Sequence, residues 1–108
     1  MKNAARKTEP DPLIIHRSAD REGATYALDR RSRDRLRKEL GDEAHFAPRV
    51  FIAHETEADY KQIRGAIMPQ IALILTGLPE RRLSELGAIV FIDPVTEEKL
   101  DSWRPARP

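Results

Sequence analysis

The hydrophobic pattern is most regular over residues 60–93, where proline and glycine separate short apolar runs. An almost continuous apolar run predicts a short, buried helix over residues 69–76. This run begins with a proline, which suits the first turn of a helix because no backbone donor is needed there. A leading proline and a closing glycine predict a second short helix over residues 79–87. The run Ile-Val-Phe-Ile at 89–92 then predicts a buried strand.

Two shorter apolar runs near the N-terminus predict a β-hairpin. Residues 13–16 are apolar and largely branched, and residues 24–28 contain a second run of strand-forming side chains. Asp20 and Gly23 lie between the two runs, and both residue types are common in tight connections. We therefore expect two antiparallel strands joined by a short turn.

Residues 29–40 follow the hairpin and have helical spacing. Leu36 and Leu40 lie four positions apart, as neighbours on one helical face do. Ser32 is suited to cap the first turn, and Gly41 can close the last one. Because the apolar stripe is thin, we expect this helix to lie on the surface.

The second half of the chain predicts one more strand and two more helices. Residues 50–54 are typical of a strand, and Thr56 begins a helix whose first turn contains Asp59 in a capping arrangement. We expect this helix to end before Pro69, because the residue before a proline tends to leave the helical region. After a turn, residues 96–103 predict a short final helix that docks through two apolar side chains.

An internal echo appears when residues 50–64 are laid over residues 90–104. Six of the fifteen positions are identical, including Val-Phe-Ile at the start and Thr-Glu in the middle. The echo has two interpretations, a duplicated unit or the convergence of buried strands that lead into capped helices, and we favour convergence. Both strands are apolar on both faces, so we expect both to be central in one sheet.

Composition is consistent with one small α+β domain, built from the hairpin, central strands at Val50 and Ile89, and four or five short helices. The chain has 108 residues and 40% apolar side chains, which is enough for one modest core. Its 19 basic and 18 acidic side chains nearly cancel. The chain as a whole therefore lacks the strongly basic character of proteins that bind nucleic acid mainly by charge.

We expect the domain to span residues 13–103, between a flexible arm at 1–12 and a flexible tail at 104–108. Within it, Leu75 lies in the most apolar run and should contribute strongly to stability. Leu13 lies next to the arm and should matter less.

The chain contains no cysteine, which excludes disulfides and thiolate metal sites. Its first residues form no apolar signal segment, and no apolar run approaches the roughly 18 residues that a membrane span needs. We therefore expect a soluble cytoplasmic protein that has no membrane partner and carries no cofactor or metal.

A dense basic cluster lies within the predicted helix at 29–40. It has two interpretations: a patch for phosphate or an acidic partner surface, or a solvated helix face whose charges are partly neutralised by nearby acidic residues. If the patch is functional, we expect Arg30, Arg31, Arg35 and Lys38 to contribute to partner binding. The cluster comprises Arg30, Arg31, Arg33, Arg35, Arg37 and Lys38.

Residues 71–86 resemble a helix-turn-helix unit, with Gly77 in the turn and a second helix that exposes Arg81 and Arg82. The resemblance implies DNA binding, with these two arginines as contact residues. Two features depart from the pattern. Leu73 stands where closely crossing helices usually need a small residue, and acidic side chains balance the two arginines. The DNA hypothesis gains support if these arginines share a face with the basic cluster at 30–38.

No arrangement of side chains indicates catalysis. The three histidines, His16, His45 and His54, lack the spacing of metal ligands, and the five glycines form no phosphate-binding loop. Ser32 and Ser84 lie in helical contexts without a neighbouring base. We therefore expect a non-enzymatic regulatory or adaptor protein that binds another macromolecule, most directly a protein. DNA binding through the helix-turn-helix-like segment is the alternative.

Overall fold

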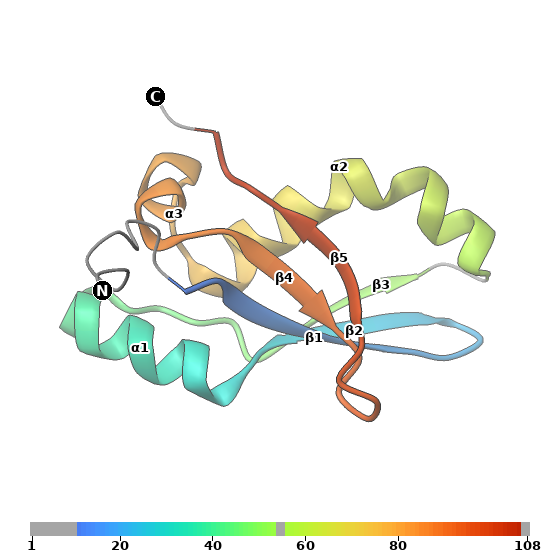
Figure 1. Cartoon of the computed structure of the whole chain (residues 1–108), viewed down its shortest axis with the longest axis horizontal. Coiled ribbons are helices and arrows are strands. Elements are labelled where there is room, and N and C mark those ends of the chain that lie inside the picture. Colours follow the sequence, from blue (N-terminus) through green and yellow to red (C-terminus); the bar gives the residue numbers. More distant parts are fainter. Residues whose placement is uncertain (1–10, 54–55, 107–108) are drawn as a thin grey trace, which may run out of the picture.

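A computed structural model describes residues 11–53 and 56–106 (Figure 1). Over these residues the chain forms five strands, three α-helices and one 3₁₀ turn, so the predicted α+β class is confirmed. His54, the arm before residue 11 and the last two residues lie outside the described part. The strands are β1 (Leu13–Ala19), β2 (Gly23–Leu28), β3 (Val50–Ala53), β4 (Ile89–Ile92) and β5 (Lys99–Trp103). The helices are α1 (Arg30–Leu40), α2 (Glu57–Thr76) and α3 (Glu80–Leu86), and the turn is η2 (Gly41–Glu43).

All five strands form one mixed sheet in the order β3-β2-β1-β4-β5. β1 and β4 run parallel, and the other neighbouring pairs run antiparallel. The N-terminal hairpin therefore supplies the centre of the sheet. The chain leaves it through the helices and returns to add β4 and β5 on the other side of β1.

One face of the sheet is covered by α2, which lies behind the strands in Figure 1. Side chains alternate along β1, so that Leu13, Ile15 and Arg17 are buried while their neighbours are less so. Ile71 and Leu75 of α2 are buried in the same core. The core continues through the fully buried side chains of the other elements, namely Ala24, Tyr26, Leu36, Ala72, Leu83, Ile89 and Phe91.

The predicted hairpin is present, and its turn is built by Asp20. One carboxylate oxygen of Asp20 accepts the backbone N–H groups of Glu22 and Gly23, at 2.8 and 3.2 Å. Gly23 is also required by space, because a Cβ there would come within 2.2 Å of the carbonyl oxygen of Ile52 in β3. Glycine thus lets β3 pair closely with β2.

The cap of α1 differs from the prediction. Asp29 is the capping residue, and its side chain accepts the N–H of Arg31 at 3.1 Å. Ser32 is buried instead, and its hydroxyl accepts the N–H of Ile14 at 2.8 Å. This bond fixes α1 to the start of the central strand. The predicted end of the helix at Gly41 is correct.

The helices predicted at Thr56 and at Pro69 are a single helix, α2, with the proline inside it. Proline removes one backbone donor, so the bond to the carbonyl of Gly65 is lost, but the helix is not required to end. Buried residues on both sides of Pro69 pack in the interior, and this packing outweighs the local preference. The predicted cap at Thr56 is correct, since its hydroxyl accepts the N–H of Asp59 at 3.1 Å.

The helix predicted over residues 96–103 is wrong, because this segment forms a turn and the edge strand β5. Asp93 accepts the N–H groups of Val95 and Thr96, and Glu97 takes a left-handed conformation with φ of 61°. These bonds reverse the chain and place the next residues beside β4. With α2 continuous and this segment a strand, the described residues contain three α-helices rather than four or five.

The strand that begins at Val50 is an edge strand and not a central one. Val50 and Ile52 pack against the core, whereas Phe51 points to the other face and is 52% exposed. β3 leads into a helix, but β4, which begins at Ile89 and lies inside the sheet, leads into a turn and a strand. The echo at 50–64 and 90–104 is therefore not a repeated structural unit.

Leu13 is fully buried in the central strand, which contradicts the expectation that it matters less than Leu75. We predict that Leu13→Ala and Leu75→Ala each lower the free energy of unfolding by about 2–5 kcal/mol, because each leaves a cavity in the core. Denaturant titration measures both, with Ile74→Ala as the control, since Ile74 is 53% exposed on α2. A Leu13→Ala protein as stable as the Ile74→Ala control would show that the central strand is not packed as described.

Candidate functional site

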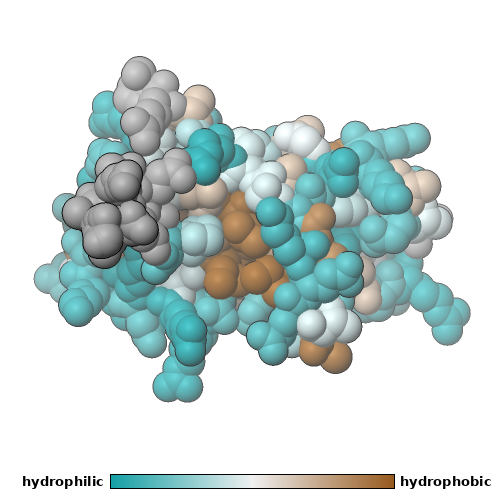
Figure 2. All heavy atoms as spheres, viewed as in Figure 1, coloured by the Kyte–Doolittle hydropathy of each residue, from teal (hydrophilic) through white to brown (hydrophobic). Residues whose placement is uncertain are grey.

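The face of the sheet turned away from α2 has no described helix over it. Ile14 of β1 pairs with Val90 of β4, and His16 lies between Ala27 of β2 and Ile92 of β4 on the same face. Figure 2 shows an apolar patch over β1 and β4 on this side, surrounded by hydrophilic residues. We call this surface the open face and define its apolar centre as Ile14, Val90 and Ile92.

The open face extends to the edge strand β3. Phe51 lies opposite Thr25 of β2, and its ring lies over Gly23, since its Cζ is 2.9 Å from where a Cβ would stand. A large aromatic side chain thus rests on the sheet with half of its surface in water. Contiguous apolar surface with a polar rim is typical of protein interaction sites.

A polar pair lies within the open face. Nε2 of His16 is 3.3 Å from a carboxylate oxygen of Asp29. The same carboxylate caps α1 by accepting the N–H of Arg31. The pair therefore connects the centre of the face to the first turn of α1.

The end of the open face near α1 is basic. Arg30 and Arg31 are exposed in the first turn of α1, directly after Asp29, whose N–H donates to the carbonyl of Ile14. Arg31 lines a hollow of about 310 Å³ together with Pro12 and Ile14. This hollow has apolar walls continuous with the apolar centre and a guanidinium group at its side. Its other lining residues are Asp11, Ser32 and Arg35.

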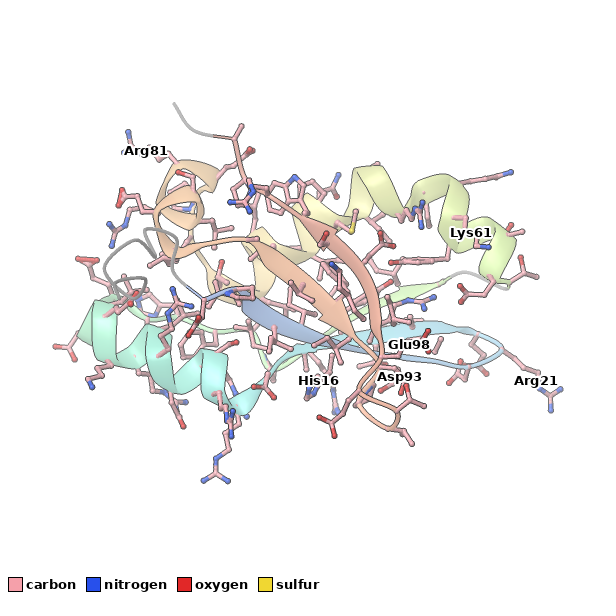
Figure 3. All side chains as sticks on the ribbon, viewed as in Figure 1. His16, Arg21, Lys61, Arg81, Asp93 and Glu98 are labelled. Carbon is pink, nitrogen blue, oxygen red and sulfur yellow. The ribbon has the colours of Figure 1, made fainter. Side chains whose placement is uncertain are left out.

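The opposite end of the open face is acidic. The turn between β4 and β5 contains Asp93, Glu97 and Glu98, and Val95 at its tip is 88% exposed. Figure 3 shows Asp93 and Glu98 at this turn. Backbone N–H groups of Thr96 and Val95 hold the pKa of Asp93 below its usual value, so its carboxylate is charged at neutral pH.

The predicted binding residues of α1 divide into two groups. Arg30, Arg31 and Lys38 are exposed. Arg35 instead donates to the backbone carbonyls of Asp11 and Leu86 and lies 3.5 Å from Glu39. Arg35 thus joins α1 to the end of α3 and has a structural role.

Of two further arginines in the cluster, Arg37 is paired and Arg33 is partly buried. Arg37 lies 3.7 Å from Asp34, and its guanidinium stands 5.3 Å from the ring centre of Phe46. Arg33 is half-buried on α1, and its Nε is enclosed. The freely exposed part of the cluster is therefore smaller than the sequence suggests.

The helix-turn-helix-like segment forms a corner that packs against other parts of the chain. Gly77 takes a left-handed conformation, and a Cβ there would meet the carbonyl oxygen of His45 at 2.4 Å. At the start of α3, Glu80 accepts the N–H of Ala106 at 2.8 Å, so the C-terminal segment crosses the end that would enter a DNA groove. The helix predicted to begin at Thr56 is the first part of α2 and does not form a separate unit.

Arg81 and Arg82 do not combine with the basic cluster. Arg82 lies 2.9 Å from Glu85 on α3. Figure 3 shows Arg81 extending from the upper edge of the molecule, whereas α1 lies along the lower edge. DNA binding would have gained support if Arg81 and Arg82 shared a face with the basic cluster at 30–38, and they do not.

A buried charged network lies on the covered face and was not predicted from the sequence. Arg17 is only 4% exposed; its Nε donates to the hydroxyl of Tyr26 and its Nη2 to Glu57, both at 3.2 Å. Its guanidinium stands 3.7 Å from the ring centre of Tyr60, a cation–π contact. The hydroxyl of Tyr60 donates to Asp101 at 2.9 Å. Arg64 of α2 lies 3.4 Å from the same carboxylate.

The network joins β1, β2 and β5 to the first half of α2. Burial alone would lower the pKa of Arg17, but Tyr26 and Glu57 more than offset this effect, so the pKa is raised and the guanidinium stays charged. Burial also raises the pKa of Tyr26 and of Tyr60, and Asp101 raises that of Tyr60 further. The arrangement has the properties of a structural clamp, because each polar group has a partner.

A second hollow, of about 910 Å³, is open and lies between the β1–β2 turn and the first turns of α2. Its charged lining residues are Arg21, Glu22 and Asp59, which carry both signs and form no catalytic grouping. In the part of the chain that the structure describes, no group of three or more histidine or acidic side chains is placed to hold a metal ion. No described helix is long and apolar enough to cross a membrane.

Comparison with models of protein families, with curated proteins and with solved structures gives no match to this chain.

One signal in the sequence could have identified part of these surfaces. Alternation from Leu13 through Ile15 places Arg17 on the inner face, and Ile14 and His16 on the outer one. The contact between Arg17 and Glu57 joins residues 40 positions apart, and no local pattern indicates it.

We predict that neither tyrosine of the chain ionises at pH values near its ordinary pKa of about 10 while the protein is folded. Both pKa values are raised, so the folded state holds these protons more tightly than the unfolded state does. Stability from this source is complete below about pH 10 and is lost as the pH rises toward the folded pKa values. Ultraviolet titration of phenolate, compared with the chain in denaturant, measures this; equal midpoints would contradict the network.

Proposed function

We propose that the chain is a small, non-enzymatic regulatory or adaptor protein that acts by binding another protein through the open face. The observation that supports this most directly is the apolar centre at Ile14, Val90 and Ile92, over which no described helix lies. A sheet normally buries a face this apolar, and an uncovered one gains free energy when a partner removes it from water.

The distribution of charge favours protein over DNA as the partner. Arg30 and Arg31 adjoin one end of the face, but Glu97 and Glu98 adjoin the other, so the described residues of this face form no continuous basic surface for a phosphate backbone. A protein surface can match both signs. The residues that we propose for partner binding are the apolar centre, Phe51, and the exposed side chains Arg30 and Arg31 of α1, with Lys38 farther along the same helix.

The test compares two single substitutions of an exposed or half-exposed apolar residue by lysine. Val90→Lys places a charge in the apolar centre, and the matched control Ile74→Lys places one on α2. Each variant and the wild type is cross-linked in extract of the native host, and the captured proteins are quantified. We expect the wild type and Ile74→Lys to capture the same proteins in equal amounts. Val90→Lys should capture at least about tenfold less of them, because a buried charge at the centre of an interface is costly.

Equal capture by Val90→Lys and the wild type would overturn the proposed surface. DNA binding remains the alternative function, and a mobility-shift titration with excess nonspecific competitor tests it. Salt-resistant binding that is lost on replacing Arg81 and Arg82 by alanine would replace protein binding with the helix-turn-helix hypothesis.

A further inference from the structure

We propose that the protein bound by the open face is a second copy of this chain, packed face to face about a two-fold axis; this inference rests on the function proposed above. The two ends of the open face carry opposite charges, and one of them has an exposed apolar turn whereas the other has a hollow. Consider a two-fold axis that lies between the two sheets, parallel to them and perpendicular to their strands. Such an axis places the acidic end of one copy opposite the basic end of the other. It reverses the strand direction, so the β4–β5 turn of each copy meets the α1 end of the other.

The area of the sheet supports an interface that includes both ends. Five strands of four to seven residues, at about 4.8 Å spacing and about 3.3 Å per residue, cover a flat area of roughly 400 Å². A stable interface buries about 800 Å² on each partner. The apolar centre therefore needs additional contacts, and the two-fold arrangement supplies the turn and the hollow on each copy.

Val95 is the side chain that we propose inserts into the second copy. It is the most exposed large apolar side chain among the described residues, at 88%, and it stands at the tip of the β4–β5 turn. Asp93 holds the turn through hydrogen bonds to the N–H groups of Val95 and Thr96, and Glu97 donates its N–H back to the carbonyl of Asp93. The backbone of the turn is thus held in place before any partner arrives, which reduces the entropy lost on binding.

The hollow beside α1 is where we propose that Val95 of the second copy binds. Its volume of about 310 Å³ exceeds that of a valine side chain, and Pro12 and Ile14 give it apolar walls that adjoin the apolar centre. Arg31 stands at its side and is exposed. When Val95 of one copy enters the hollow of the other, Glu98 of the first copy lies beside the guanidinium of Arg31 of the second. This charge pair fixes how the two faces are aligned.

The two-fold symmetry makes a reciprocal test possible. In the dimer, Arg31 of each copy faces Glu98 of the other, so each single charge reversal creates two repulsive pairs. We expect Arg31→Glu and Glu98→Arg to weaken dimerisation at least about tenfold each. When the two variants are mixed, a heterodimer restores both attractive pairs. Sedimentation velocity over a dilution series measures each variant and the mixture.

Val95→Asp and two matched controls complete the experiment. We expect Val95→Asp to weaken dimerisation at least about tenfold, because it removes the apolar contact and adds a charge. Ile74→Asp, on the far side of the molecule, and Arg81→Glu, on α3, should dimerise like the wild type. Thermal unfolding of every variant shows that a change in mass is not a loss of folding.

Each result bears on the proposal. A wild-type chain that stays monomeric at the highest concentration overturns the dimer, as does a mixture of Arg31→Glu and Glu98→Arg that associates no better than either variant alone. If the chain is monomeric but Val90→Lys still abolishes capture of a different protein, the function proposed above stands and only the second copy is wrong. If Val90→Lys alters neither capture nor mass, both proposals fail.

Discussion

The arrangement of this protein depends on how α2 is held against one face of the sheet. The second half of the helix is held by apolar packing, with Ile71 and Leu75 buried among residues of the sheet. The first half lies over Arg17, where the buried face of the sheet changes from apolar to charged. There the cation–π contact with Tyr60 and the ion pair with Glu57 take the place of hydrophobic burial. A buried guanidinium is tolerated because its partners compensate for the loss of water.

Because α2 packs on one face of the sheet, no helix of the described residues covers the other face. The connections explain why: α1 is fixed beside the start of β1 through Ser32, and Arg35 attaches it to the end of α3. Among the described helices, α1 adjoins the open face; it touches the face at its first turn and brings Arg30 and Arg31 there. The β4–β5 turn brings acidic side chains to the other end. The surface that we propose as functional is thus a consequence of where each of the three described helices is held.

The sequence predicted the local elements better than their neighbours in space. The hairpin, the strand at 89–92 and the cap at Thr56 follow from turn chemistry and from local side-chain preferences. The prediction of a helix end before Pro69 was wrong because tertiary packing stabilises the helix on both sides of the proline. The prediction of a helix at residues 96–103 was wrong because pairing with β4 outweighs a weak helical pattern. Arg30 and Arg31 are exposed, as the interpretation of the basic cluster as a binding patch requires. The structural role of Arg35 arises from its contacts with the backbone of Asp11 and Leu86, which the sequence pattern does not encode.

The central claim is that the open face is the surface at which this protein meets a partner, and a dilution series of methyl NMR spectra tests it on the unmodified chain. Ile14, Val90, Ile92 and Val95 report on the open face and its turn, and Ile74 reports on α2. The account predicts that signals of the first four shift together as concentration rises, while that of Ile74 does not. Shifts confined to Ile74, or no shifts at any concentration together with an unaltered spectrum in host extract, would contradict it.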